Sequence, residues 1–323
     1  MMPMLDVRNL STVFPMPSGD VHAVNNVSYS LEAGESLAIV GESGSGKSVS
    51  VLSLIDLVPS PGKVENGQVE FRDRDILKLQ KSELQRVRGR RIGMVFQDPM
   101  TSLNPVLSVG YQLTEALRWH MNLNKTDARK QVIETLHLVG ISNAEERLVD
   151  YPHQFSGGQR QRIMIAMAIV CRPDLLIADE PTTALDVTIQ AQIVDLIKAL
   201  QEKFGMAVIW ITHDLALVAG IVDRVAVMYA GSIIEHGTVD AIFTKAAHPY
   251  TQCLLRSMPG HESTERGRLY SIEGNPPDLR QLTDSCPFAP RCPQSVERCL
   301  EKRPSLEPAT STHRVACWQA TLQ

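Results

Sequence analysis

The residues best suited to chemistry form a glycine-rich loop near the N-terminus. The loop reads Gly41-Glu42-Ser43-Gly44-Ser45-Gly46-Lys47-Ser48 and has the form G-x-x-x-x-G-K-[ST]. Its glycines let several backbone N–H groups point at one centre, and a helix that starts there adds positive potential. The Lys47 ammonium can reach β- and γ-phosphates, and the Ser48 hydroxyl can bind Mg²⁺. The loop therefore predicts a site for a nucleoside triphosphate.

The segments on either side of the loop have the pattern that this motif requires. Residues 36–40 are apolar enough for a buried strand, and residues 49–58 predict a helix that Pro59 and Pro61 end. The sequence therefore predicts a strand, a phosphate-binding loop and a helix in succession.

Two adjacent carboxylates, Asp179 and Glu180, end the apolar segment 175–178. In a chain with a phosphate-binding loop, Asp179 is placed to hold Mg²⁺ (the Walker B role) and Glu180 to act as general base on the attacking water. The alternative for Glu180 is that it caps the following turn.

Polar side chains also follow two other predicted strands. Gln97 follows residues 92–96 and can reach Mg²⁺ or the attacking water, although an ordinary turn would look similar. His213 follows residues 206–211. A lone histidine there is more often structural, but the shared sheet edge with Asp179 favours a γ-phosphate-sensing role.

Two further features could bind nucleotide. Ser156-Gly157-Gly158 precedes the apolar run from Ile163, so it is a second glycine loop at a helix start, although such a pair is often only a turn. Phe14, in a loop of Pro, Gly and Ser, could stack on adenine or simply cover an apolar edge.

Composition limits the class of protein. The chain has 323 residues, 43% of them hydrophobic, with a net charge of -4, so no basic surface for nucleic acid is indicated. We find neither a signal-peptide pattern nor the ~18 apolar residues of a membrane span. We expect a cytoplasmic chain that reaches a membrane only through partners.

The six cysteines fall into two groups. Cys171 and Cys253 lie in apolar surroundings and are predicted core residues. The other four have the spacing C-x5-C-x6-C-x17-C and are Cys286, Cys292, Cys299 and Cys317. Clustered thiols in a cytoplasmic chain indicate a metal or cluster site before disulfides. Iron–sulfur, zinc and free or structural thiols all remain open, although zinc ribbons favour paired C-x2-C spacing.

Taken together, these motifs closely resemble the ATP-binding subunits of ABC transporters. The correspondence covers residues 5–245 and comprises the Walker A loop at 41–48, the Q-loop Gln97, the signature Phe155-Ser156-Gly157-Gly158-Gln159, Walker B at 175–180, the D-loop Ala184-Leu185-Asp186 and the switch His213. Phe155 stands where the family usually has Leu, and both are apolar anchors.

The resemblance implies an architecture. It is an α/β fold with a RecA-like P-loop NTPase core, an antiparallel β subdomain, an inserted α-helical subdomain at about 98–160 and a small cysteine-containing C-terminal extension. The ATP-binding domain would span 1–245 and the extension 246–323. Phe14 stands where the family's adenine-stacking aromatic is expected.

The resemblance also implies a mechanism. Two such domains pair head to tail around two ATP molecules, so Ser156, Gly157 and Gly158 would serve the partner's nucleotide. Lys47, Glu180 and His213 would serve this chain's own. ATP binding would close the pair and hydrolysis reopen it, and the intact motifs predict a hydrolysis-competent site.

The C-terminal part resembles a narrower group. His248-Pro249-Tyr250-Thr251 and the segment 97–105 resemble dipeptide and oligopeptide importer ATPases, though nickel and opine importers share much of this. Some of this group hold a [4Fe-4S] cluster at such cysteines. The implied partners are two transmembrane permease subunits, a periplasmic or extracellular solute-binding protein and a paralogous second ATPase, at the cytoplasmic face of the inner membrane.

Two other classes compete with the importer. A soluble ABC ATPase acting on ribosomes or DNA repair complexes usually has two cassettes or long insertions, whereas this chain has one P-loop and one signature. A regulatory module that binds ATP without turnover is disfavoured by the intact Glu180 and His213.

Overall fold

The computed structural model describes residues 3–183, 185–258, 270–280 and 283–320. The chain forms two compact units. The first comprises Met1–Glu32, Ser36–Lys78 and Ile211–Gln323, and the second comprises Ala33–Glu35 and Leu79–Trp210. The boundaries predicted from the sequence, at residue 245 and at about 98–160, stay predictions.

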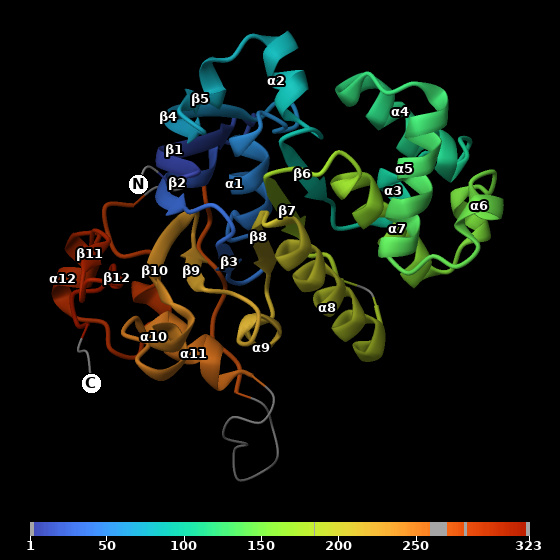
Figure 1. Ribbon diagram of the computed structural model, residues 1–323. Helices are drawn as coiled ribbons and strands as arrows, with labels where there is room; N and C mark the ends of the chain where they lie inside the picture. The colour runs from blue at the N-terminus through green and yellow to red at the C-terminus, as the bar shows by residue number, and fades with distance from the viewer. Residues whose placement is uncertain (1–2, 184, 259–269, 281–282, 321–323) are drawn as a thin grey trace. The chain divides into compact units, whose positions relative to one another are not determined.

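The first unit contains a four-stranded antiparallel sheet in the order β2-β1-β4-β5 (Figure 1). Its strands are β1 (Leu5–Phe14), β2 (Val21–Leu31), β4 (Lys63–Phe71) and β5 (Arg74–Asp75). Alternating apolar and polar residues at 5–10 and 21–31 predict two antiparallel strands. Both strands form, but β1 continues to Phe14, which pairs with Val21. Phe14 therefore ends a strand and does not lie in the predicted loop.

The first unit also holds the strand that leads into the glycine loop. All five residues of β3 (Ser36–Val40) are buried, and β3 runs parallel to β9 (Arg224–Tyr229). Burial on both faces explains the continuous apolar run. After Gly46 the helix α1 (Lys47–Leu54) packs against β1 and β2. It starts two residues before the predicted start and ends four before the predicted end.

The C-terminal extension adds strands to the same sheet. The sequence predicts a hairpin of residues 224–229 and 232–236 joined across Ala230-Gly231. β9 and β10 (Ser232–Thr238) form this hairpin, and β10 pairs with β12 (His313–Val315), which pairs with β11 (Glu307–Pro308). The Glu235 carboxylate, fully buried, accepts hydrogen bonds from His313 Nε2 at 2.8 Å and from the Ala247 N–H at 2.6 Å. These buried hydrogen bonds link β12 to β10.

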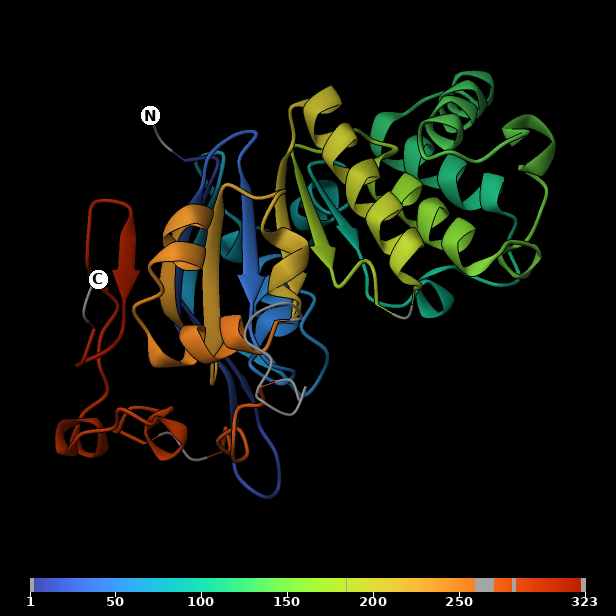
Figure 2. The same cartoon turned by 90° about the horizontal axis from the view of Figure 1, so that it is seen from below.

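Short helices complete the first unit. They are η1 (Ile76–Lys78), α9 (Leu215–Val218), α10 (Val239–Thr244), α11 (Pro249–Arg256), η3 (Ala289–Arg291) and α12 (Glu297–Glu301). Figure 2 shows α10, in orange, against β9 and β10. The polar, Pro- and Gly-containing residues 260–284 predict a linker. They lie partly outside the described residues, and 270–280 contain neither helix nor strand.

The second unit contains the other strands that position candidate site residues. They are β6 (Ile92–Val95) and β7 (Leu175–Asp179), which pair in parallel, and the first part of β8 (Ala207–Thr212), whose last two residues belong to the first unit. Every residue of β7 and β8 is buried. The buried strands predicted near 92–96, 175–180 and 206–211 are confirmed to within two residues at either end.

Helices make up most of the second unit (Figure 1). They are α2 (Lys81–Val87), α3 (Pro99–Ser102), α4 (Val109–Met121), α5 (Lys125–Leu138), α6 (Ala144–Arg147), η2 (Pro152–Gln154), α7 (Gly157–Ile169) and α8 (Val187–Phe204). α4, α5 and α7 pack on one another and bury apolar residues such as Leu113 and Val132. Within the described residues, none of the helices combines the length and hydrophobicity that a membrane crossing requires.

Candidate active site

The glycine loop is shaped by close backbone contacts. Gly46 has φ +100°, and a Cβ there would lie 2.1 Å from the Ala23 carbonyl oxygen. A Cβ on Gly41, which has φ +154°, would lie 2.2 Å from the Met228 carbonyl oxygen. Only glycine fits both the dihedral angles and the space, which is why these two positions of the motif cannot carry a side chain.

The lysine of the loop is held by the loop itself. Lys47 begins α1 and is 5% exposed, and its Nζ donates to the carbonyl oxygens of Gly41 at 2.8 Å and Glu42 at 2.9 Å. Ser48 follows in the first helical turn and is half-buried. The structure therefore places an ammonium group and a hydroxyl at the start of one helix, as the motif predicts.

The carboxylate pair lies at the end of β7. Asp179, the last residue of the strand, is buried, and Glu180 has the left-handed φ of +45°. Strained backbone at a non-glycine residue is concentrated at functional sites. The Glu180 Oε2 accepts hydrogen bonds from Gln97 Nε2 at 3.0 Å and from the Thr183 hydroxyl at 2.9 Å. The structure thus brings Gln97 and Glu180 together and adds Thr183, which sequence reasoning missed.

His213 belongs to the first unit. It follows Thr212, the last residue of β8, and its side chain is exposed. The next residue, Asp214, caps α9 by accepting a hydrogen bond from the Ala216 N–H at 2.9 Å. The predicted position of His213 at a strand end is confirmed, whereas its phosphate-sensing role stays a prediction.

The second glycine loop starts α7 in the second unit. Ser156 caps the helix: its hydroxyl accepts from the Gln159 N–H at 3.3 Å, while Gln159 Oε1 accepts from the Ser156 N–H at 3.1 Å. This reciprocal capping box satisfies two backbone donors. A Cβ on Gly157 would meet no atom within 4 Å, whereas one on Gly158 would lie 3.2 Å from the Ile189 side chain.

Two other predicted residues have structural contacts. Asp186 caps α8 by accepting from the Ile189 N–H at 2.9 Å; its neighbour in the predicted D-loop, Ala184, lies outside the described residues. Phe155 is buried as an apolar anchor, with the Arg147 guanidinium 4.0 Å from its ring centre. Cation–π contact of this kind fixes the segment before the glycine loop.

The ring of Phe14 packs against a turn of the first unit. A Cβ on Gly62 would lie 2.5 Å from the Phe14 ring and 2.6 Å from the Val58 side chain, so the glycine leaves room for the ring. Phe14 is half-buried. This contact matches the edge-covering alternative, and adenine stacking stays a prediction.

The four C-terminal cysteines line one small cavity in the first unit, next to His248, Phe288 and Trp318. The Cys286 N–H donates to the Cys299 carbonyl at 2.8 Å, and burial raises the pKa of Cys317 to about 11. Among the residues described, however, no three Cys, His, Asp or Glu side chains are arranged to hold a metal ion. Cys171 and Cys253 are buried, as predicted for core residues.

Sequence reasoning also missed two residues that contact the glycine loop. Arg291 forms a two-pronged ion pair with the Glu42 carboxylate, and the Tyr250 hydroxyl accepts a hydrogen bond from the Glu42 N–H. Tyr250 lies in the segment that suggested the narrower family, whereas Arg291 stands between two of the cysteines. That spacing drew attention to sulfur chemistry and gave no signal for an ion pair.

A strand, glycine loop and helix, together with a carboxylate pair at a strand end, define a P-loop ATPase. The family model described as "ABC transporter" matches residues 24–183, and the model described as "Oligopeptide/dipeptide transporter, C-terminal region" matches residues 234–299. This chain belongs to the ABC transporter family, as an ATP-hydrolysing ATP-binding protein that carries this C-terminal region.

Individual relatives agree over nearly the whole chain. The oligopeptide transport ATP-binding protein OppD of Bacillus subtilis is 50% identical over 98% of this chain and 88% of its own length. The dipeptide transport ATP-binding protein DppD of the same organism is 51% identical over 97% and 94%. A solved dimer of the ATP-binding cassette MJ0796, bound to ADP and Pi, has a TM-score of 0.66 at 28% identity and covers 73% of this chain and 99% of its own. The predicted fold class is thereby confirmed.

Proposed function

We propose that this chain binds and hydrolyses ATP to power the import of dipeptides or oligopeptides through a membrane permease. The observation that carries the proposal is the presence of both an intact ATP motif set and the oligopeptide/dipeptide transporter C-terminal region in one chain. Relatives named for oligopeptide and dipeptide transport, each about half identical over nearly all of the chain, support peptides as the solute.

In this proposal, different residues of the chain bind the phosphates of ATP and the Mg²⁺ ion. The backbone N–H groups of Gly41–Ser48 and the Lys47 ammonium bind the phosphates. Mg²⁺ neutralises phosphate charge when bound, and the donors that suit it are the Ser48 hydroxyl, the buried Asp179 carboxylate and the Gln97 amide. The boundaries 1–245 for this domain and 246–323 for the extension belong to the same proposal.

Glu180 is proposed as the base that takes the proton from the attacking water. Gln97 and the Thr183 hydroxyl both donate to its Oε2, which holds the carboxylate in one orientation. Fixing a base before the reaction reduces the reorganisation needed in the transition state. His213 is proposed to contact the γ-phosphate.

The residues Ser156, Gly157, Gly158, Gln159 and Asp186 are proposed to serve the nucleotide of a second ATPase. An exposed helix start with positive potential is suited to an anion, and the space beside Gly157 is open. The partner is proposed to be a paralogous ATPase in a head-to-tail pair that closes on ATP binding and reopens on hydrolysis.

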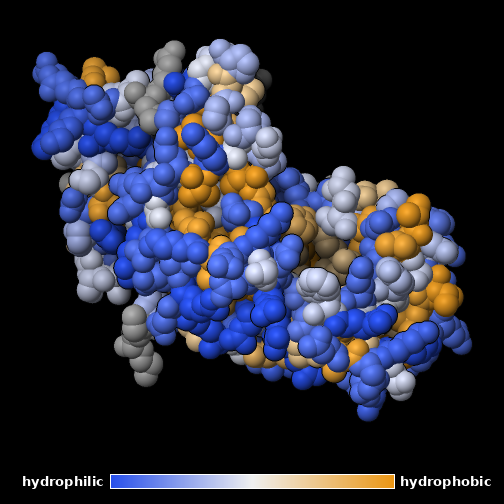
Figure 3. Space-filling view, turned by 90° about the horizontal axis from the view of Figure 1, so that it is seen from above, coloured by the Kyte–Doolittle hydropathy of each residue, from blue (hydrophilic) through white to orange (hydrophobic). Residues whose placement is uncertain are grey.

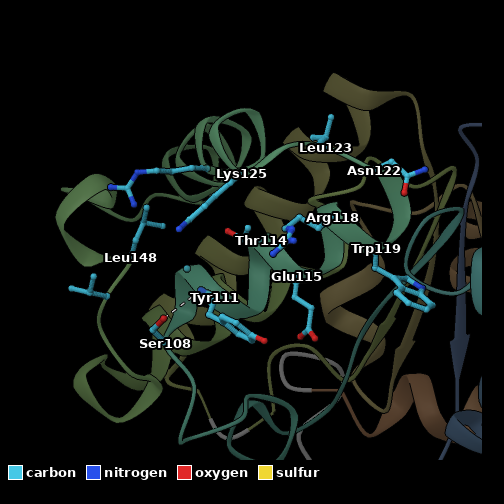
Figure 4. Close-up of a pocket in the computed structure, with 13 residues that line it drawn as sticks. Ser108, Tyr111, Thr114, Glu115, Arg118, Trp119, Asn122, Leu123, Lys125 and Leu148 are labelled. Atoms are coloured by element: carbon cyan, nitrogen blue, oxygen red, sulfur yellow. Dashed lines mark hydrogen bonds between the residues drawn. The ribbon is translucent and has the colours of Figure 1, made fainter.

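The helical insert at about 98–160 is proposed to contact the permease. An open groove of about 940 Å³ lies along α4 there, lined by Tyr111, Glu115, Arg118 and Trp119 among others (Figure 4). Tyr111 and Trp119 are 55% and 69% exposed, and apolar side chains gather on this helical part in Figure 3. Exposed aromatic side chains of this kind mark protein interfaces. Two permease subunits would hold the chain at the cytoplasmic face of the inner membrane, with a solute-binding protein on the other side.

The four C-terminal cysteines are proposed to hold a [4Fe-4S] cluster, with zinc as the alternative. Their common cavity supports this, because four thiols from separate turns converge there. The thiols would have to draw closer to bind the ions, since no metal-binding arrangement is present among the described residues. A bound cluster would brace the extension. Iron and acid-labile sulfide in anaerobically purified protein, absent from Cys292→Ser, would establish it; protein with neither would refute it.

Co-purification tests the transport function. A tagged Glu180→Gln chain, which traps the ATP-bound state, is recovered from gently solubilised membranes together with whatever binds it. Two polytopic membrane proteins and a second ABC ATPase are the expected partners, and the solute-binding protein encoded beside them would separate peptides from nickel or opines. Ribosomes, nucleic acid or only soluble partners would instead favour a non-transport ABC ATPase.

A further inference from the structure

The C-terminal extension reaches the ATP loop through one arginine. Arg291 Nη1 and Nη2 donate to the two Glu42 carboxylate oxygens at 2.8 and 3.0 Å. The Arg291 side chain is 5% exposed and that of Glu42 26% exposed. A two-pronged pair that is mostly shielded from water is stronger and better oriented than a surface pair.

The arginine is itself fixed on all sides. Its Nε donates to the Glu273 carbonyl at 3.0 Å, and Nη1 also donates to the Tyr229 hydroxyl at 3.2 Å. The hydrogen bond and charge of Glu42 raise the pKa of Arg291, so it stays charged. Arg291 therefore holds Glu42 from a rigid support rather than from a flexible surface chain.

An aromatic cluster holds the backbone of the same loop residue. The Glu42 N–H donates to the Tyr250 hydroxyl at 2.9 Å, and Tyr250 is fully buried. The rings of Tyr229 and Phe288 lie 4.5 and 5.4 Å from that of Tyr250, and Phe288 comes from the turn between Cys286 and Cys292. Ring contacts at these distances are stabilising, so the cysteine segment and the loop share one packed core.

Glu42 is also the residue that organises the rest of the loop. Its carbonyl oxygen accepts from Lys47 Nζ at 2.9 Å and from the Ser45 N–H at 3.2 Å. We propose that Arg291 is a positioning residue for ATP binding, through which the C-terminal extension holds Glu42 and with it the phosphate-binding loop. This inference rests on the proposed role of residues 41–48 as the ATP site.

Charge gives the contact a second effect. The Glu42 carboxylate belongs to a loop proposed to bind a highly anionic triphosphate, and an unpaired carboxylate there would repel it. Arg291 cancels that charge in a partly buried setting, where screening by salt is weak. Loss of Arg291 should therefore weaken binding twice, by loosening the loop and by exposing the triphosphate to a negative charge.

Equilibrium titration of the full-length chain with a fluorescent ATP analogue and Mg²⁺ tests this. We expect Arg291→Ala to weaken affinity about tenfold. Arg291→Lys keeps the charge but loses the paired geometry, so its affinity should lie between those of wild type and Arg291→Ala. Arg280→Ala is the matched control, since Arg280 pairs with Asp278 in the same extension but both are exposed. The control should bind like wild type, and melting curves with and without nucleotide show whether each variant is folded.

The double variant Arg291→Ala/Glu42→Gln separates positioning through Glu42 from general support of the fold. If Arg291 acts through Glu42, Glu42→Gln should itself weaken binding and the double variant should bind no worse than Arg291→Ala alone, so the two effects should be strongly non-additive. Additive losses, or a folded Arg291→Ala chain with wild-type affinity, would overturn the inference. A wild-type chain that does not bind the analogue, with Lys47→Ala no different, would instead overturn the ATP site itself.

Discussion

The two glycine loops of this protein are built in different ways. The loop at 41–48 is braced by residues outside it. Backbone carbonyl groups lie close to Gly41 and Gly46, and the side chains of Arg291 and Tyr250 form hydrogen bonds with Glu42. The loop at 156–158 is held by its own capping box, and the position of a Cβ on Gly157 is open. The first loop is therefore preorganised, whereas the second exposes the start of a helix.

This difference matches the two roles proposed for the loops. A loop that must bind triphosphate on its own gains affinity from preorganisation, because less ordering is needed on binding. A loop that completes a partner's site needs an open approach instead. Variants that change one loop or its support at a time show whether the effects on ATP binding and on hydrolysis can be separated.

The largest effect on ATP binding is expected from Gly46→Ala. Its Cβ would meet the Ala23 carbonyl at 2.1 Å, and φ +100° is strained for alanine, so the braced loop cannot keep its shape. We expect ATP affinity to fall at least ~100-fold, measured by titration with the fluorescent analogue. Gly220→Ala, whose Cβ would meet nothing within 4 Å, is the control. Undiminished binding in a folded Gly46→Ala chain would show that the loop is not braced.

Glu180→Gln leaves both loops intact and removes only the proposed base. ATP binding should stay close to wild type, while steady-state hydrolysis by the assembled transporter falls ~10²- to 10⁴-fold. Phosphate release measured at saturating ATP gives the result. Because Gln keeps the shape of the side chain, near-normal hydrolysis would exclude Glu180 as the general base.

The stability of the fold around the braced loop should depend on pH through His248. This histidine caps α11, and its Nδ1 accepts from the Tyr250 N–H at 3.0 Å. Burial lowers its pKa to about 4, against 6.5 in the unfolded chain. Below pH 6.5 the unfolded chain therefore binds a proton that the folded chain refuses, and the free energy of unfolding should decrease by about 2 kcal/mol between pH 7 and 5.

Denaturant titration at several pH values measures this contribution. His248→Asn is the matched variant, because Asn can cap a helix but does not titrate. The pH dependence should become shallower in that variant. His236, whose pKa burial and Arg224 lower to about 3, and His120, whose pKa burial and Arg90 lower, contribute to the part that remains. An unchanged slope would mean that His248 does not couple protons to folding.

The smallest effect concerns the self-capped loop. Ser156→Ala removes the hydroxyl that caps α7 and should lower the free energy of unfolding by about 1 kcal/mol. Ser156→Asp retains a capping oxygen and should restore stability but not transport-coupled hydrolysis, since its charge would face a phosphate. Recovery of full hydrolysis in Ser156→Asp would argue against an anion at this helix start.

Much of the fold follows from local patterns. The apolar runs that predict β3 and β7, and the amphipathic pattern at 109–121 that predicts α4, give the observed bounds to within a residue, since burial on one or both faces sets their periodicity. The predicted end of α1 and the predicted length of β1 were wrong. Strand pairing of Phe14 with Val21 is a non-local contact that extends β1 past a pattern that breaks at residue 10.

The candidate site shows the same limit. Gln97, Glu180 and Lys47 could be assigned from motifs because those motifs tie chemistry to strand and helix ends. The Arg291–Glu42 pair could not, since an ion pair between residues 249 positions apart leaves no local pattern. Thr183 is only three residues from Glu180, but a threonine there gives no sign of which atom its hydroxyl contacts. Contacts made by side chains across the fold need the structure.

Comparing Gly46→Ala with Gly157→Ala in two assays tests most directly whether the two loops serve different nucleotides. One assay is ATP binding to the isolated chain, and the other is ATP hydrolysis by the complete transporter in membranes. Gly46→Ala should fail in both, whereas Gly157→Ala should bind like wild type and lose hydrolysis, because its methyl group would fill the open space that is proposed to receive the partner's nucleotide. If Gly157→Ala weakens binding to the isolated chain as much as Gly46→Ala does, the two loops serve the same nucleotide, which contradicts the separate roles proposed for them.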